Sequence, residues 1–136
     1  MSNLEQTLSI IKPDAIERSL EKEIKNTFVN KGFKIVKEKK IMLEKSEAEE
    51  FYKVHQTKPF YNDLCEYLSS GPIVVMILEK ENAIGENRSL MGATNPKEAV
   101  DGTIRKKYGI SIDKNSVHGS DSSENAEKEI NFFFKN

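Results

Sequence analysis

The sequence predicts an α+β sandwich of the ferredoxin-like kind, in which helices cover one four-stranded antiparallel sheet and a helical hairpin is inserted. Three observations lead to this fold class. β-Rich stretches alternate with stretches of helical periodicity, in the order β-α-β, helical hairpin, β-α, loop, β-α. One stretch is apolar throughout, as expected of a central strand. The 136 residues contain no repeat or linker, so we expect one domain over residues 1–136.

The first third of the chain predicts a strand–helix–strand unit. Thr7–Lys12 is β-rich and is followed by Pro13, so Lys12 is expected at the end of a strand, where an exposed lysine is also common. Apolar residues then recur every four positions, at Ile16, Leu20, Ile24 and Phe28. Gly32 ends this helix, and Phe33–Leu43 forms the second strand.

The next stretch predicts the helical hairpin. Ser46–Glu49 has the pattern of a capping box and opens a helix that runs past Tyr52. Lys58-Pro59 breaks it, and a second helix runs from Phe60 to about Gly71. The two aromatic side chains, Tyr52 and Phe60, are expected near the tip. Their spacing fits packing within the hairpin as well as the stacking of a nucleotide base.

The central strand and a candidate anion site come next. Pro72–Glu79 is the apolar run, and Asn82–Leu90 is a short helix that carries Arg88. A polar loop then extends to about residue 113 and contains Gly102-Thr-Ile-Arg105. Arginine binds phosphate through its planar fork of N–H groups, although a solvated surface charge is the alternative for both arginines.

The last stretch presents one histidine before a helix. A short strand reaches His118, and Gly119 permits a sharp turn. Asp121 is the expected N-cap, with Glu124 at the third helical position. Glu129 lies at the edge of the apolar face of this helix and could point toward His118; that face comprises Ala126, Ile130, Phe133 and Phe134.

This position gives His118 a chemical use. A helix N-terminus favours anions, and a neutral imidazole is a nucleophile at physiological pH. It can accept a phosphoryl group if a second residue fixes the tautomer through the other ring nitrogen. A capped surface helix after an ordinary histidine fits the local pattern equally well.

Composition limits the partners. Lys+Arg 21 and Asp+Glu 22 nearly cancel, so no global charge favours nucleic acid or membranes. No apolar run approaches membrane-spanning length, and the N-terminus lacks the layout of a signal peptide, which predicts a cytoplasmic protein. The single cysteine, Cys65, excludes an internal disulfide, and the only histidine besides His118 is His55, so no zinc-type spacing exists.

Taken together, the motifs resemble those of nucleoside diphosphate kinases over essentially the whole chain. Any one is weak, but their order and separations are specific. They are Ile11-Lys-Pro-Asp14, Lys31-Gly-Phe33, His55-Gln-Thr-Lys-Pro-Phe60, Ser70-Gly-Pro72, Met91-Gly-Ala-Thr-Asn-Pro96, Gly102-Thr-Ile-Arg105 and Asn115-Ser-Val-His-Gly-Ser-Asp-Ser122.

The resemblance implies transfer of the γ-phosphoryl group from ATP or another nucleoside triphosphate to a nucleoside diphosphate, by a ping-pong route through phosphohistidine. It implies His118 as the nucleophile and Glu129, with Ser120 beside it, as the group that orients the imidazole. The implied nucleotide contacts are Lys12, Arg88, Arg105, Thr94 and Tyr52 at the phosphates, Lys12 and Asn115 at the sugar, and Phe60 and Ile112 at the base.

The resemblance further implies Mg²⁺ held through the nucleotide phosphates, with few or no direct protein ligands, and a homo-oligomer, either hexamer or tetramer. The chain departs from the family's usual pattern at some positions, among them Ser19 in place of a frequent glycine and Lys106-Lys107 in the phosphate-side loop. Two alternative functions are a non-catalytic nucleotide- or RNA-binding module and a histidine phosphatase. The near-neutral charge and the lack of an aromatic RNA-binding strand disfavour the module.

Overall fold

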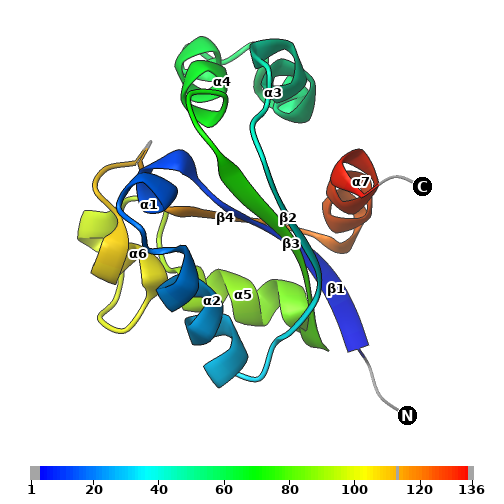
Figure 1. Ribbon diagram of the computed structural model, residues 1–136, viewed down its shortest axis with the longest axis vertical. Coiled ribbons are helices and arrows are strands. Elements are labelled where there is room, and N and C mark those ends of the chain that lie inside the picture. Colours follow the sequence, from blue (N-terminus) through cyan, green and yellow to red (C-terminus); the bar gives the residue numbers. More distant parts are fainter. Residues whose placement is uncertain (1–3, 113, 135–136) are drawn as a thin grey trace.

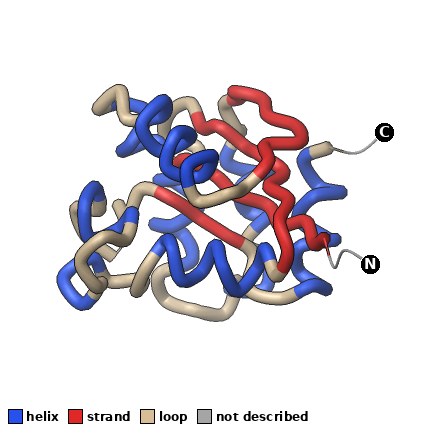
Figure 2. The backbone as a smooth tube through the Cα atoms, turned by 90° about the horizontal axis from the view of Figure 1, so that it is seen from below, coloured by secondary structure: helices blue, strands red, loops and turns tan. Residues whose placement is uncertain are grey.

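Four antiparallel strands form one sheet in the order β2-β3-β1-β4. Figure 1 labels these strands, and Figure 2 shows strands in red among the helices. The computed structural model describes residues 4–112 and 114–134. The two central strands are β1 (Leu4–Ile11) and β3 (Ile73–Glu81), and the edge strands are β2 (Lys34–Ile41) and β4 (Val117–Gly119). β3 is buried over six consecutive residues, Ile73 to Leu78, as its apolar run predicts. The predicted fold class is confirmed.

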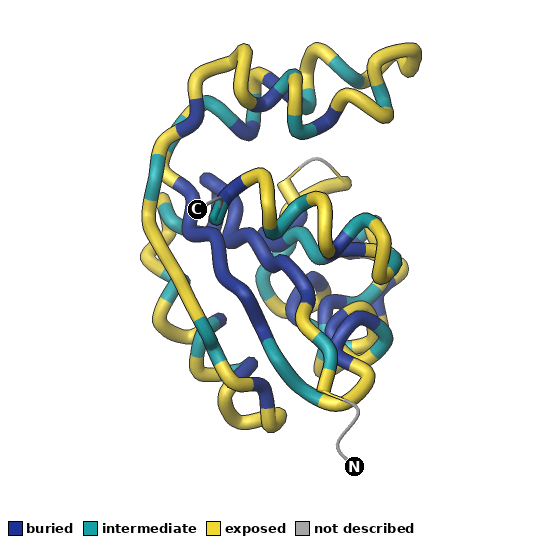
Figure 3. The backbone as a smooth tube through the Cα atoms, turned by 90° about the vertical axis from the view of Figure 1, so that its right-hand side faces the viewer, coloured by how far each residue is buried: buried dark blue, intermediate teal, exposed yellow. Residues whose placement is uncertain are grey.

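Helices cover both faces of this sheet. On one face, α2 (Glu21–Asn30) and α5 (Ala83–Met91) pack on a core that includes Ile24, Phe28 and Met76. The hairpin of α3 (Lys45–Phe51) and α4 (Tyr61–Leu68) covers the other face together with α7 (Ser123–Phe133). Buried residues therefore run along the central strands, between the two helical layers (Figure 3).

The predicted first helix is wrong in one respect, because it is two helices. α1 (Pro13–Glu17) has Arg18 as its C-cap, and α2 begins at Glu21. Between them, Ser19 has φ 60°, in the left-handed region. An L-residue in this region cannot continue a right-handed helix, and glycine adopts it at less cost. The serine thus occupies a position where its side chain adds backbone strain.

The start of α3 also differs from the prediction. Its N-cap is Glu44, not Ser46, and the backbone N–H of Glu44 donates to the Glu47 carboxylate at 2.9 Å. The sequence contains two overlapping patterns with a glutamate three residues after a possible cap, and the earlier one begins the helix. α3 then ends at Phe51 and passes into a short 3₁₀ helix, η1 (Lys53–His55), well before the proline that was expected to break it.

The predicted polar loop after α5 contains two short helices, η2 (Pro96–Glu98) and α6 (Ile104–Tyr108). Thr103 is the N-cap of α6, where its Oγ1 accepts from the Lys106 N–H at 3.3 Å. Arg105 therefore lies on an ordered turn, and its side chain is buried. In the part of the chain that the structure describes, no helix has both the length and the apolar character needed to cross a membrane.

Candidate active site

His118 lies in the middle of β4, where it pairs with Ile10 of β1. The predicted sharp turn at Gly119 is wrong, because this glycine belongs to the same strand and pairs with Ser9. A Cβ on Gly119 would lie 2.7 Å from Met91 Cε and closer still to the Asn87 side chain. Glycine is therefore required here by the close packing of α5 against β4, which sets the backbone next to His118.

Glu129, on α7, holds the imidazole of His118. One of its carboxylate oxygens, Oε1, lies 2.8 Å from His118 Nε2 and accepts a second bond, from Ser120 Oγ, at 2.9 Å. Because an ionised carboxylate only accepts, Nε2 carries the proton and Nδ1 keeps its lone pair. Ser120 is itself tied to β1, since its Oγ accepts from the Leu8 N–H at 3.3 Å.

The helix that carries Glu129 starts one residue later than predicted. Its N-cap is Ser122, whose Oγ accepts from the Asn125 N–H at 3.1 Å, and so Glu124 is the second helical residue, not the third. Asp121, the predicted cap, instead accepts from the Asn125 side chain at 2.6 Å. This hydrogen bond lowers the pKa of Asp121, with the charge of Arg88 a smaller contributor.

Three of the predicted nucleotide contacts form a chain of hydrogen bonds. Lys12 Nζ donates to Asn115 Oδ1 at 2.8 Å, and Asn115 Nδ2 donates to the backbone oxygen of Thr94 at 3.1 Å. Lys12 and Asn115 are both almost fully buried, whereas Thr94 is exposed. The exposed end-of-strand position that was the alternative for Lys12 is therefore wrong.

Arg105 is buried beneath the strand that carries His118. Its guanidinium donates to the backbone oxygens of Gly92 at 3.0 Å and of Val117 at 2.9 Å. Burial lowers the pKa of Arg105 to about 10, so the side chain is still charged at neutral pH. Arg88 is exposed on α5, and neither arginine forms an ion pair within the described residues.

Tyr52 is the C-cap of α3, where the connection of the hairpin begins, and its side chain packs into the core. Only 6% of it is exposed. Burial raises the pKa of its hydroxyl, and the charge of Glu129 raises it further, so this side chain stays a neutral donor. A cavity of about 370 Å³ lies beside His118, and its lining includes Tyr52, His55, His118, Asp121, Glu129 and Phe132. The predicted phosphate and sugar contacts Lys12, Arg88, Thr94, Arg105 and Asn115 do not line it.

The two predicted base contacts are both on the surface. Phe60 is 43% exposed and Ile112 is 55% exposed. Phe60 precedes α4, and its ring centroid lies 5.9 Å from that of His55. Ile112 belongs to the segment between α6 and β4. Large apolar side chains left exposed at the edge of a polar site are available to a ligand.

The whole chain matches known proteins. A family model described as nucleoside diphosphate kinase matches residues 5–136. The chain belongs to the nucleoside diphosphate kinase family. It is 57% identical to a nucleoside diphosphate kinase of Nitrosococcus oceani over 132 residues, which cover 97% of this chain and 92% of that protein. It is 56% identical to one of Campylobacter curvus, with 96% of each chain covered.

The fold agrees with solved nucleoside diphosphate kinases. The structure from Aquifex aeolicus superposes with a TM-score of 0.95 at 41% identity and covers 97% of this chain and 96% of its own. The apo enzyme from Encephalitozoon cuniculi gives 0.94 at 39% identity, with 97% and 90% covered. These likenesses extend over the full sheet and both helical layers.

Sequence reasoning missed two members of this kinase-family site. Phe51 packs edge-on against His118, with ring centroids 5.4 Å apart, and so limits the motion of the imidazole. Asp121 was assigned only a capping role, although it lines the same cavity as His118. Phe51 gave no signal beyond being an aromatic residue on a helix. The short spacing from His118 could have indicated Asp121.

Proposed function

We propose that this chain is a nucleoside diphosphate kinase in which His118 takes the γ-phosphoryl group of a nucleoside triphosphate and passes it to a nucleoside diphosphate. The observation that carries the proposal is the bond between Glu129 and His118 Nε2. It leaves the lone pair of Nδ1 as the nucleophile, and the carboxylate can stabilise the positive charge that the ring gains on phosphorylation. Names of relatives matched along the full chain support catalysis over a binding module.

The two arginines would stabilise the charge on the transferred group. Phosphoryl transfer depends mainly on positioning and on electrostatic stabilisation of a loose transition state. Arg105 is held rigidly by two backbone oxygens, and Arg88 adds a second cation from α5. Lys12, Thr94 and the neutral hydroxyl of Tyr52 would supply further donors to phosphate oxygens.

Sugar recognition would use the buried pair Lys12 and Asn115, and base recognition would use two exposed apolar residues. Lys12 and Asn115 present polar groups suited to ribose hydroxyls. Phe60 and Ile112 would hold the base between them, and stacking uses only the π-face of a base. Broad base tolerance would follow, so that ATP and other nucleoside triphosphates would serve as donors.

Mg²⁺ would be held mainly by the nucleotide phosphates. No cluster of three or more His, Cys, Asp or Glu side chains suited to a metal occurs in the described ranges. Asp121 does fit a supporting role, because its lowered pKa keeps it ionised and it lines the cavity in front of His118. When bound, Mg²⁺ would neutralise phosphate charge and orient the β- and γ-phosphates.

The phosphatase alternative is less well supported. It would need a general acid or base beside the phosphorylated nitrogen, and the acidic residue that contacts the imidazole is Glu129. Its carboxylate contacts Nε2, on the opposite side of the ring from Nδ1. The base and sugar contacts would also have no use in such an enzyme. Within this proposal the protein is cytoplasmic and forms a hexamer or a tetramer, which light scattering of the purified protein would distinguish.

The proposal is tested at the nucleophile. The chain has two histidines, so His118→Asn and His55→Asn form a matched pair. We expect His118→Asn to abolish transfer and phosphohistidine while nucleotide binding, measured by calorimetry, stays close to wild type. The His55→Asn protein should still carry the label. Continued transfer by the His118→Asn protein would overturn the mechanism.

A further inference from the structure

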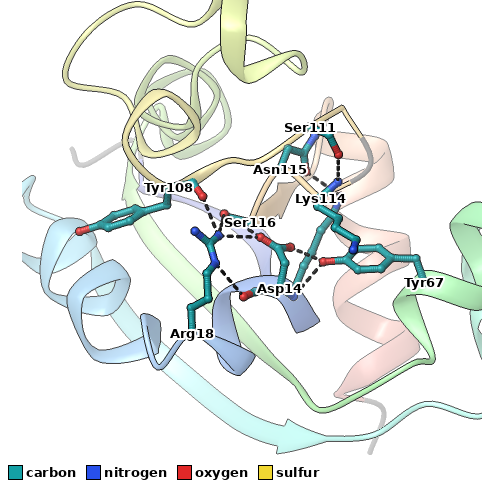
Figure 4. Close-up of polar contacts among 9 residues, drawn as sticks. Asp14, Arg18, Tyr67, Tyr108, Ser111, Lys114, Asn115 and Ser116 are labelled. Atoms are coloured by element: carbon teal, nitrogen blue, oxygen red, sulfur yellow. Dashed lines mark hydrogen bonds and ion pairs between the residues drawn. The ribbon is translucent and has the colours of Figure 1, made fainter.

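Asp14 is buried at the start of α1, two residues after Lys12, and only 5% of it is exposed. Its carboxylate lies at the centre of a network drawn in Figure 4. One oxygen accepts from the Tyr67 hydroxyl, and the other accepts from Ser116 Oγ and from Arg18 Nη2, each at 3.0 Å. The mechanism above does not use this carboxylate.

The network joins three segments that are far apart in the sequence. Tyr67 belongs to α4, the helix that follows Phe60. Arg18 Nη2 also donates to the backbone oxygen of Tyr108, at the end of α6, at 2.6 Å. Asp14 thus links α4, whose N-cap is Phe60, to the segment between α6 and β4, which contains Ile112. Phe60 and Ile112 are the two proposed base contacts.

The third segment contains a strained turn. Ser116 has φ 73°, and the Val117 N–H donates to the Asn115 backbone oxygen at 2.9 Å, two residues back. A three-residue turn with positive φ is rare for a residue other than glycine and persists only where its surroundings hold it. Ser116 is held here by its hydroxyl bond to Asp14 and by its backbone oxygen, which accepts from the Lys12 N–H at 2.8 Å. Asn115, on one side of this turn, is thereby placed against Lys12.

We infer that Asp14 is a positioning residue of the nucleotide site, which sets the distance between the base contacts and the place of Asn115. This inference rests on the proposed function. His118 is positioned by other means, because β1, Glu129 and Ser120 hold it. Loss of the Asp14 carboxylate should therefore weaken recognition of the nucleoside and leave the nucleophile intact.

Asp14→Asn is the direct test. The amide keeps the shape but removes the charge opposite Arg18 and leaves one acceptor oxygen, so its NH2 group must face either the Tyr67 hydroxyl or the donors of Arg18 and Ser116. We expect the KM for a nucleoside diphosphate to rise roughly five- to hundredfold, the range of a lost base-stacking contact. Phosphorylation of His118 by phosphoramidate, a donor without base or sugar, should proceed at the wild-type rate. Asp63→Asn is the control, because Asp63 is an exposed carboxylate of α4 that lines the same surface hollow as Asp14.

Tyr67→Phe covers the case in which Asp14→Asn does not fold. It removes only the hydroxyl that bonds to Asp14 and should produce the same split between KM and phosphoramidate reactivity to a smaller extent. An unchanged KM in a folded variant would overturn the inference, and so would a parallel loss of both activities. Failure of the wild-type protein to become phosphorylated would instead refute the proposed function, so the two failures are distinguishable.

Discussion

Replacement of Glu129 by glutamine tests how the imidazole of His118 is activated. Glutamine keeps an acceptor oxygen of the same reach, so the 2.8 Å contact to Nε2 and the 2.9 Å contact from Ser120 can persist. The negative charge is lost. A charge-assisted hydrogen bond contributes about 1.5–3 kcal/mol and a neutral one about 0.5–1.5 kcal/mol. The transition state, in which the ring becomes positive, should therefore lose about 1–2 kcal/mol.

This loss corresponds to a roughly five- to thirtyfold fall in the rate of phosphoryl transfer to His118. The nucleotide KM should change little, because the carboxylate faces the imidazole and not the ligand. Rapid-quench measurement of base-stable label from γ-labelled ATP gives the rate directly. Glu127→Gln, an exposed change on the same helix, serves as control. Phosphorylation of the Glu129→Gln protein at the wild-type rate would refute the reasoning, as would a large rise in KM with no change in kcat.

Three further substitutions test neighbouring parts of the site. Arg105→Ala should weaken triphosphate binding about tenfold or more in calorimetry and nucleoside binding little, because the proposed function assigns its charge to the phosphates. Equal losses would count against this role. Gly119→Ala should lower the free energy of unfolding by about 1–3 kcal/mol and reduce kcat, because the added methyl group overlaps side chains of α5. Gly71→Ala should do neither, because its added Cβ would lie 3.6 Å from Pro13 Cβ, an ordinary contact distance. Asp121→Asn should reduce the loss of melting temperature on acidification. In the wild type, the lowered pKa of Asp121 stabilises the fold above its ordinary value of 3.8, and this stabilisation disappears as the pH falls through the lowered pKa. Asparagine does not titrate, so the variant lacks this contribution. Identical losses in melting temperature on acidification of wild type and variant would contradict that assignment.

Periodicity in the sequence was enough to predict the elements of the fold. The apolar run from Ile73 to Leu78 is the buried central strand, and the helical hairpin is present. Strand order could not be predicted from periodicity, because β1 lies between β3 and β4, which follow it at very different distances along the chain. Such pairing depends on tertiary packing and leaves no local pattern.

Errors in the prediction arose where local patterns compete or where packing decides. Two overlapping capping patterns precede α3, and the structure uses Glu44. Gly119 was interpreted as the sign of a turn, although glycine is needed there because Met91 of α5 lies too close for a side chain. Periodicity gave no sign of the break at Ser19, since serine is tolerated in helices, although the family resemblance marks a frequent glycine at this position. For the site, motif order led to the proposed participants. The network around Asp14 joins residues up to 102 positions apart and is visible only in the fold.

The most direct measurement of the proposed reaction is a phosphoryl chase. The protein is incubated with γ-labelled ATP, a sample is quenched in alkali, and a different nucleoside diphosphate is added to the remainder. Phosphohistidine is stable in base and labile in acid, so the proposed mechanism predicts base-stable label on His118 that moves into the new nucleoside triphosphate. Release of the label only as inorganic phosphate, or bound nucleotide without any label on the protein, would contradict it.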